Sequence, residues 1–146
     1  MHEIVVGVDG SESSVQALRF AVAEARAHNT QVKVVKAWNV PPLAYGAGRS
    51  VTVNPAEYTK IAQIELDKTL EEAEVATSGV TVTPILCEGQ AAEILCEQAR
   101  GADLLVVGSR GLGGFRGLLL GSVSQQCVNH APCPVVIIPH RRSEVS

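Results

Sequence analysis

The feature that most constrains the fold is a regular alternation between short apolar runs and segments of helical periodicity. Ile4 to Val8 is an apolar run rich in β-branched residues, which is typical of a buried strand. From Glu12 onward, apolar residues recur every three or four positions, which predicts an amphipathic helix with Ser11 as its N-cap. One strand followed by one helix is the unit that the rest of the chain repeats.

The alternation continues almost to the end of the chain. We expect strands at Ile4–Val8, Gln31–Trp38, Val80–Cys87, Leu104–Val107 and Pro134–Pro139. We expect helices from Glu12 to about His28, from Tyr58 to about Ser78–Gly79, over Gln90–Arg100 and over Ser122–Ala131. This order predicts an α/β fold with a mostly parallel, doubly wound sheet and helices on both faces. Pro84 favours an edge position for the third strand.

Two connections are longer than usual. Residues 40–55 carry three prolines and two glycines, which makes them a candidate lid or binding loop. Residues 108–121 form a glycine-rich segment between the fourth strand and the last helix.

Composition and charge exclude several classes of protein. The chain has 146 residues, 46% of them hydrophobic and 18% charged, which suits one globular domain over residues 1–140 with a short polar tail at 141–146. A net charge of −3 argues against nucleic acid and anionic membrane as partners. No apolar run approaches the roughly 18 residues that span a bilayer. The start of the chain lacks a basic segment and an apolar signal core, so we expect a cytoplasmic protein.

Four cysteines stand at positions 87, 96, 127 and 133, and no two are spaced as C-x-x-C. A zinc site or a thioredoxin-like motif is therefore disfavoured. We expect buried or half-buried thiols in a reducing compartment.

The glycine-rich segment has chemistry that suits phosphate. Glycine has no Cβ, so backbone N–H groups can approach an anion closely. The segment runs into a helix start near Gly121–Ser124, where unpaired N–H groups and the helix dipole favour negative charge. Arg110 and Arg116 can add positive charge. The alternative is a flexible connection, and the segment matches neither a P-loop nor a dinucleotide-binding fingerprint.

Four segments, in order, resemble the universal stress protein family. They are VGVDGS at 6–11, ADLLVVGSRG at 102–111, the spacing Gly108-x2-Gly111-x9-Gly121-Ser122, and APCPVVIIP at 131–139. The spacing resembles the ATP-binding signature of that family, and the resemblance covers about Glu3 to Pro139. It implies a Rossmann-like sheet of five parallel strands in the order 3-2-1-4-5, of the adenine nucleotide alpha hydrolase type. Strand order then reverses between strands 1 and 4, where ligands of such sheets bind.

The resemblance also implies roles around a bound ATP. The adenine would be bordered by Val8, Asp9 and Ala37, and the nucleoside by Val107 and Gly108. The phosphates would be held by Arg110, Gly111, Gly121, Ser122, Val123 and Ser124. Asp9 would also touch the ribose or a bound Mg²⁺, and its alternative role is a cap at the helix start. Many family members carry a histidine where this chain has Lys36.

Three functions compete on this evidence. The first is a binding module that holds ATP, with Mg²⁺, and acts as a nucleotide-dependent sensor or regulator in stress response, with at most slow hydrolysis. The second is a weak ATPase or another adenine-nucleotide enzyme, since residues 9–14 faintly resemble the S-G-G-x-D-S loop of ATP pyrophosphatases but lack its first serine. The third is a nucleotide-free dimeric interaction module, against which Gly111, Gly121 and Ser122 argue. We find no catalytic constellation of nucleophile, base and orienting group.

Self-association is expected through the last strand. In the order 3-2-1-4-5, the run Val135, Val136, Ile137 and Ile138 is an apolar sheet edge, and such an edge invites pairing with a copy of itself. The family resemblance also implies a homodimer.

Overall fold

The structure is a computed structural model that describes residues 2–39, 54–109 and 121–139. Most of the predicted loop at 40–55 and the polar tail at 141–146 lie outside the described residues. So do Arg110, Gly111 and Arg116. Among the described residues, no helix is long and apolar enough to cross a membrane.

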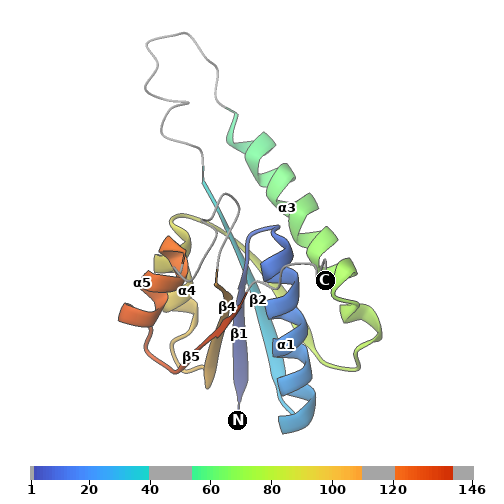
Figure 1. The fold of residues 1–146 in the computed structure, drawn as a ribbon. Coiled ribbons are helices and arrows are strands. Elements are labelled where there is room, and N and C mark those ends of the chain that lie inside the picture. The colour runs from blue at the N-terminus through green and yellow to red at the C-terminus, as the bar shows by residue number, and fades with distance from the viewer. Residues whose placement is uncertain (1, 40–53, 110–120, 140–146) are drawn as a thin grey trace, which may run out of the picture.

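Strands and helices alternate along the chain, as the sequence predicts (Figure 1). The strands are β1 Glu3–Val8, β2 Gln31–Trp38, β3 Val82–Glu88, β4 Leu104–Gly108 and β5 Val135–Ile138. The helices are α1 Glu12–His28, α3 Pro55–Glu72, α4 Ala91–Gln98 and α5 Ser122–His130, with a short 3-10 turn at Val75–Thr77.

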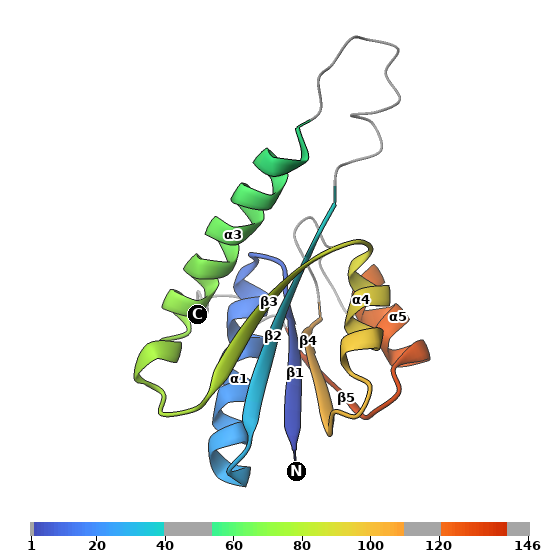
Figure 2. The ribbon, with the colours of Figure 1, turned by 180° about the vertical axis from the view of Figure 1, so that it is seen from behind.

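The strands form one five-stranded sheet in the order β3-β2-β1-β4-β5, and each described pairing is parallel. Helices α1 and α3 cover one face, and α4 and α5 cover the other (Figures 1 and 2). The predicted fold class and strand order are therefore confirmed. Pro84 lies in β3 at one edge of the sheet, where its missing N–H removes no ladder bond from a central strand.

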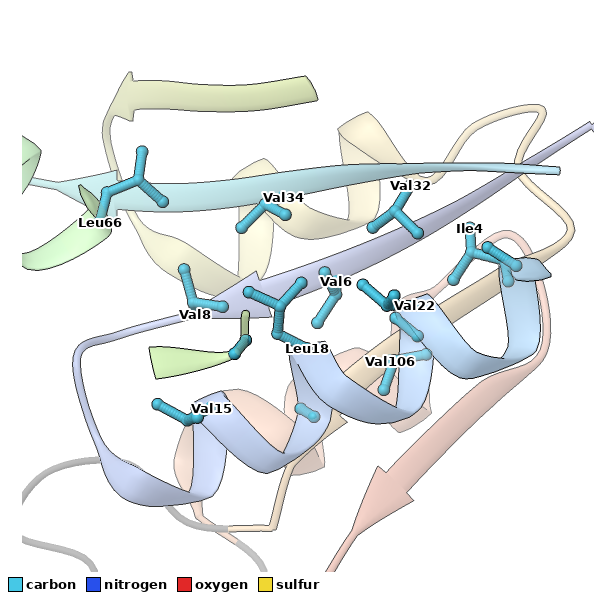
Figure 3. Close-up of a cluster of buried hydrophobic side chains, with 14 residues drawn as sticks. Ile4, Val6, Val8, Val15, Leu18, Val22, Val32, Val34, Leu66 and Val106 are labelled. Atoms are coloured by element: carbon cyan, nitrogen blue, oxygen red, sulfur yellow. The ribbon is translucent and has the colours of Figure 1, made fainter. Parts of the chain in front are cut away.

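The core has two halves, one on each face of the sheet. Alternate residues of β1 enter different halves, so that Ile4 and Val6 pack against α1 while Val5 packs toward α4. Figure 3 shows the α1 half, in which Leu18 of α1 and Leu66 of α3 meet the strands. Because both faces are covered, β1 is fully buried from Ile4 to Val6, which explains its unbroken apolar sequence.

The second helix of the pattern differs most from its prediction. It begins earlier, at Pro55, where Asn54 caps it by accepting the Ala56 N–H at 3.1 Å. It also ends earlier, at Glu72, because Glu74 adopts a left-handed conformation with φ of 56°. Gly79 therefore follows the 3-10 turn and not the long helix. The other bounds differ from prediction by up to two residues, and Gly108 belongs to β4.

Candidate functional site

The carboxyl ends of β1 and β4 lie side by side in the middle of the sheet. The two strands pair in register from Ile4 with Leu104 to Val6 with Val106. The chain continues from β1 toward β2 and β3 on one side, whereas β4 leads to β5 on the other. Strand order thus reverses between β1 and β4, which makes this edge the expected place for a ligand.

The turn from β1 to α1 is held by two backbone N–H groups that donate hydrogen bonds to short side chains. Asp9 Oδ1 accepts the Ser11 N–H at 2.9 Å, and Ser11 Oγ accepts the Ser14 N–H at 3.2 Å. Ser11 is therefore the helix cap, as predicted, and Asp9 orders the turn before it. Gly10 between them has φ of +86°, a conformation that other residues rarely adopt.

The first turn of α5 is attached to the end of β4. The Gly121 N–H donates to the Ser109 carbonyl at 2.6 Å, and Ser124 Oγ donates to the Gly108 carbonyl. The Ser124 side chain is buried, so its hydroxyl proton is used inside the protein. Ser122 is exposed and accepts a hydrogen bond from Gln126 Nε2 at 3.3 Å. Of the two serines, Ser122 has its hydroxyl at the surface.

Among the described residues, no side chain caps the N-terminus of α5, because its N-cap residue is Gly121. N–H groups in the first turn of a helix have no carbonyl partner one turn earlier. Those groups, together with the helix dipole, favour an anion in front of Ser122 and Val123. This anion-favouring turn lies beside the ends of the two central strands.

A buried charge lies on the other side of β1, on β2. The Lys36 side chain is only 8% exposed, and its Nζ lies 3.8 Å from Glu65 Oε2 of α3. The same Glu65 oxygen lies against Gly10, at 2.5 Å from the position that a Cβ there would take. Glu65 therefore joins β2 to the β1–α1 turn. The sequence analysis did not predict this contact, although a lysine within an apolar strand is a visible signal.

Among the described residues, no three His, Cys, Asp or Glu side chains gather in a way that could hold a metal ion.

Comparison with known proteins decides the family. The model of the universal stress protein family matches residues 1–139. The chain belongs to the universal stress protein family. A family member of Thermus aquaticus, called universal stress protein in QAH/OAS sulfhydrylase 3′ region, is 36% identical over 92% of this chain and 96% of its own length. The chain spans 44% of a longer universal stress protein of Mycobacterium tuberculosis, to which it is 32% identical.

Solved structures of the family share this fold. A universal stress protein in complex with cAMP is 28% identical, covers 94% of this chain and 96% of its own, and superposes with a TM-score of 0.70. A universal stress protein of Archaeoglobus fulgidus in complex with dAMP is 24% identical, covers 94% of this chain and 98% of its own, and has a TM-score of 0.68.

The family resemblance implies a set of residues around a bound nucleotide, and most of them lie at this edge of the sheet. The ends of β1 and β4 carry Val8, Asp9, Val107 and Gly108, and the start of α5 carries Gly121, Ser122, Val123 and Ser124. Ala37 lies near the end of β2, the next strand of the sheet. Arg110 and Gly111 lie outside the described residues.

Proposed function

We propose that this member of the universal stress protein family is a cytoplasmic binding protein for an adenine nucleotide, with ATP as its ligand. The observation that carries the proposal is the uncapped first turn of α5, which is fixed beside the switch point by the Gly121–Ser109 hydrogen bond of 2.6 Å. First-turn N–H groups that have no partner within their own helix, placed at a switch point, suit the phosphates of a nucleotide. Relatives of this fold are known with cAMP and with dAMP, which supports an adenine nucleotide.

The described residues fit a nucleotide laid across this edge. Gly121 has φ of −63° and no side chain, so the α5 N–H groups can approach phosphate oxygens. Ser122 offers an exposed hydroxyl in the same turn. Asp9 is partly exposed and uses one carboxylate oxygen for the turn, so it can also meet a ribose hydroxyl or a Mg²⁺ that the phosphates hold. When bound, Mg²⁺ would neutralise phosphate charge.

Calorimetry on the purified protein tests the proposal. We expect ATP to bind in the presence of Mg²⁺, and we expect Gly121→Val to abolish that binding because the added side chain fills the space before the first α5 turn. The Gly121 backbone has a negative φ that valine also adopts, so the variant is expected to fold. Gln125→Val is the matched control, since it adds the same side chain at an exposed position one turn along α5.

Three results would contradict the proposal: no binding of ATP at millimolar concentration, equal binding by Gly121→Val, or equal loss in Gln125→Val. Titrations of AMP and cAMP on the same sample compare the other ligands directly. We further propose that the protein holds ATP as a nucleotide-dependent regulator in stress response and hydrolyses it slowly at most. Release of ADP within seconds in a turnover assay would contradict this part.

We also propose that the protein is a homodimer joined through Val135, Val136, Ile137 and Ile138. These residues form β5, which is an edge of the sheet, and all four are partly exposed. An apolar edge strand with open backbone groups is stabilised by pairing with another strand. Light scattering at micromolar concentration is expected to give twice the chain mass of 15.4 kDa.

A further inference from the structure

Three of the four cysteines meet on the face of the sheet that α4 and α5 cover. Cys127 of α5 is fully buried in that half of the core, and Cys96 of α4 and Cys133 of the α5–β5 connection pack against the same cluster. The Cys96 and Cys127 thiols lie side by side, and the proximity of Cys96 adds to the burial that raises the pKa of Cys127 to about 12. The two cysteines are 31 positions apart in the sequence (127 − 96), and nothing in their spacing predicts this contact.

One of these thiols can be reached from solvent. Cys96 is partly exposed and lines a groove of about 450 Å³ between α4 and α5. Glu93, Glu97, Arg100 and His130 also line the groove. A small neutral oxidant can therefore reach Cys96, whereas Cys127 lies behind it with no exposed surface.

We propose that Cys96 and Cys127 are an oxidation site, at which a peroxide converts the two thiols into a disulfide that joins α4 to α5. In the first step the Cys96 thiolate attacks one oxygen of hydrogen peroxide, the O–O bond breaks, and Cys96 becomes a sulfenic acid while hydroxide leaves. In the second step the Cys127 sulfur attacks the Cys96 sulfur and the S–O bond breaks. The sum is two thiols and one peroxide giving one disulfide and two molecules of water.

The surroundings of the two thiols set the order of the steps. Cys127 is protonated at neutral pH, because burial is the largest cause of its raised pKa. Cys96 lines the groove and therefore meets peroxide first. Cys127 is fully buried and protonated, and the thiolate is the nucleophile in such reactions, so Cys127 resolves the product slowly. The Cys96 sulfenic acid should therefore accumulate before the disulfide. Cys133 packs against the same cluster but is partly exposed, whereas Cys127 is fully buried beside Cys96, so the Cys133→Ser variant below distinguishes the two thiols.

Mass spectrometry of the full chain after peroxide treatment tests the proposal. The reduced protein is treated with hydrogen peroxide, denatured, alkylated with N-ethylmaleimide and digested without reductant. Cleavage after glutamate separates Cys96 from Cys87, because Glu88 and Glu93 lie between them. Residues 128–132 contain no lysine, arginine or glutamate, so Cys133→Ser is used to distinguish Cys127 from Cys133. We expect a Cys96–Cys127 peptide in the wild type and in Cys133→Ser, and two fewer alkylated thiols in each.

Variants at partly exposed cysteines keep the test independent of folding. Cys96→Ser is expected to abolish the disulfide, and Cys87→Ser is the matched control that should retain it, since both thiols are partly exposed. A dimedone adduct on Cys96 at early times is expected from the slow second step. The proposal is overturned if all four thiols stay free, if oxidised Cys96 ends as sulfinic acid with Cys127 unlinked, or if Cys96 links to Cys133 or to a second chain.

Discussion

Gly108 lies so close to α1 that no side chain fits at the end of β4. A Cβ built on it would lie 2.3 Å from Ser13 Oγ and 3.3 Å from the Ser13 backbone carbonyl carbon. Among the residues that the structure describes, the buried Ser13 hydroxyl has no hydrogen-bond partner. The sequence suggested a glycine beside the nucleoside, whereas the structure shows that the packing of α1 on β4 already requires a glycine at this position.

We expect Gly108→Ala to lower the free energy of unfolding by about 1–3 kcal/mol, because α1 or Ser13 must shift. Ser13→Ala should change stability little, since the hydroxyl that it removes makes no hydrogen bond to any described residue. The nearest atom to the new methyl group is Ser13 Oγ. Gly108→Ala should therefore lower the free energy of unfolding by less when Ser13 is already alanine. A double-mutant cycle by urea denaturation measures this coupling. Equal costs in the two backgrounds would contradict it.

Among the elements, α3 is joined to the sheet by a charge pair as well as by Leu66. Glu65→Ala would leave the nearly buried Lys36 ammonium without its carboxylate, so we expect a loss of about 1–3 kcal/mol of unfolding free energy. Lys36→Met should be near neutral or stabilising, because an apolar chain of similar length needs no counter-charge. Both values come from chemical denaturation.

The control for this prediction is an exposed pair with the same separation. Lys68 Nζ and Glu72 Oε1 also lie 3.8 Å apart, but on the outer side of α3. Glu72→Ala should therefore change stability by about 0.5 kcal/mol or less. If Glu65→Ala lowers the free energy of unfolding by no more than Glu72→Ala does, the burial of Lys36 adds nothing to the stabilising effect of the Lys36–Glu65 pair.

The elements also show what the sequence could predict. Strands appeared as apolar runs because both faces of the sheet are covered, and the β1–α1 turn followed from Asp9, Gly10 and Ser11, whose roles are local. The Lys36–Glu65 and Cys96–Cys127 contacts could not be predicted, because each depends on how a helix crosses a strand or another helix. The early end of α3 was missed because Glu74, which adopts the left-handed conformation, is not a typical residue for it.

For the whole molecule, the two edges of the sheet differ in how they meet solvent. The edge strand β3 contains Pro84, which has no N–H to offer a further strand, whereas β5 contains no proline between Val135 and Ile138. The carbonyl of Pro134, just before β5, accepts the N–H of Leu105 in β4. The carbonyl of Ile138, at the end of β5, accepts the N–H of Ser109, just after β4. Because parallel strands use alternate residues for one neighbour, Val135 and Ile137 direct their backbone groups away from β4. These groups are the ones that a second copy can pair with.

Val135→Pro tests this edge with little change inside the chain. Proline removes the outward N–H at the first residue of β5, where a strand tolerates it, and leaves the bonds to β4 in place. We expect the mass measured by light scattering to fall from twice 15.4 kDa toward the mass of one chain at low micromolar concentration. Val135→Ala keeps the N–H while shortening the side chain, so it should remain dimeric. If the proline variant keeps the wild-type mass across a dilution series, the copies associate through another surface, and the open β5 edge must be protected in some other way.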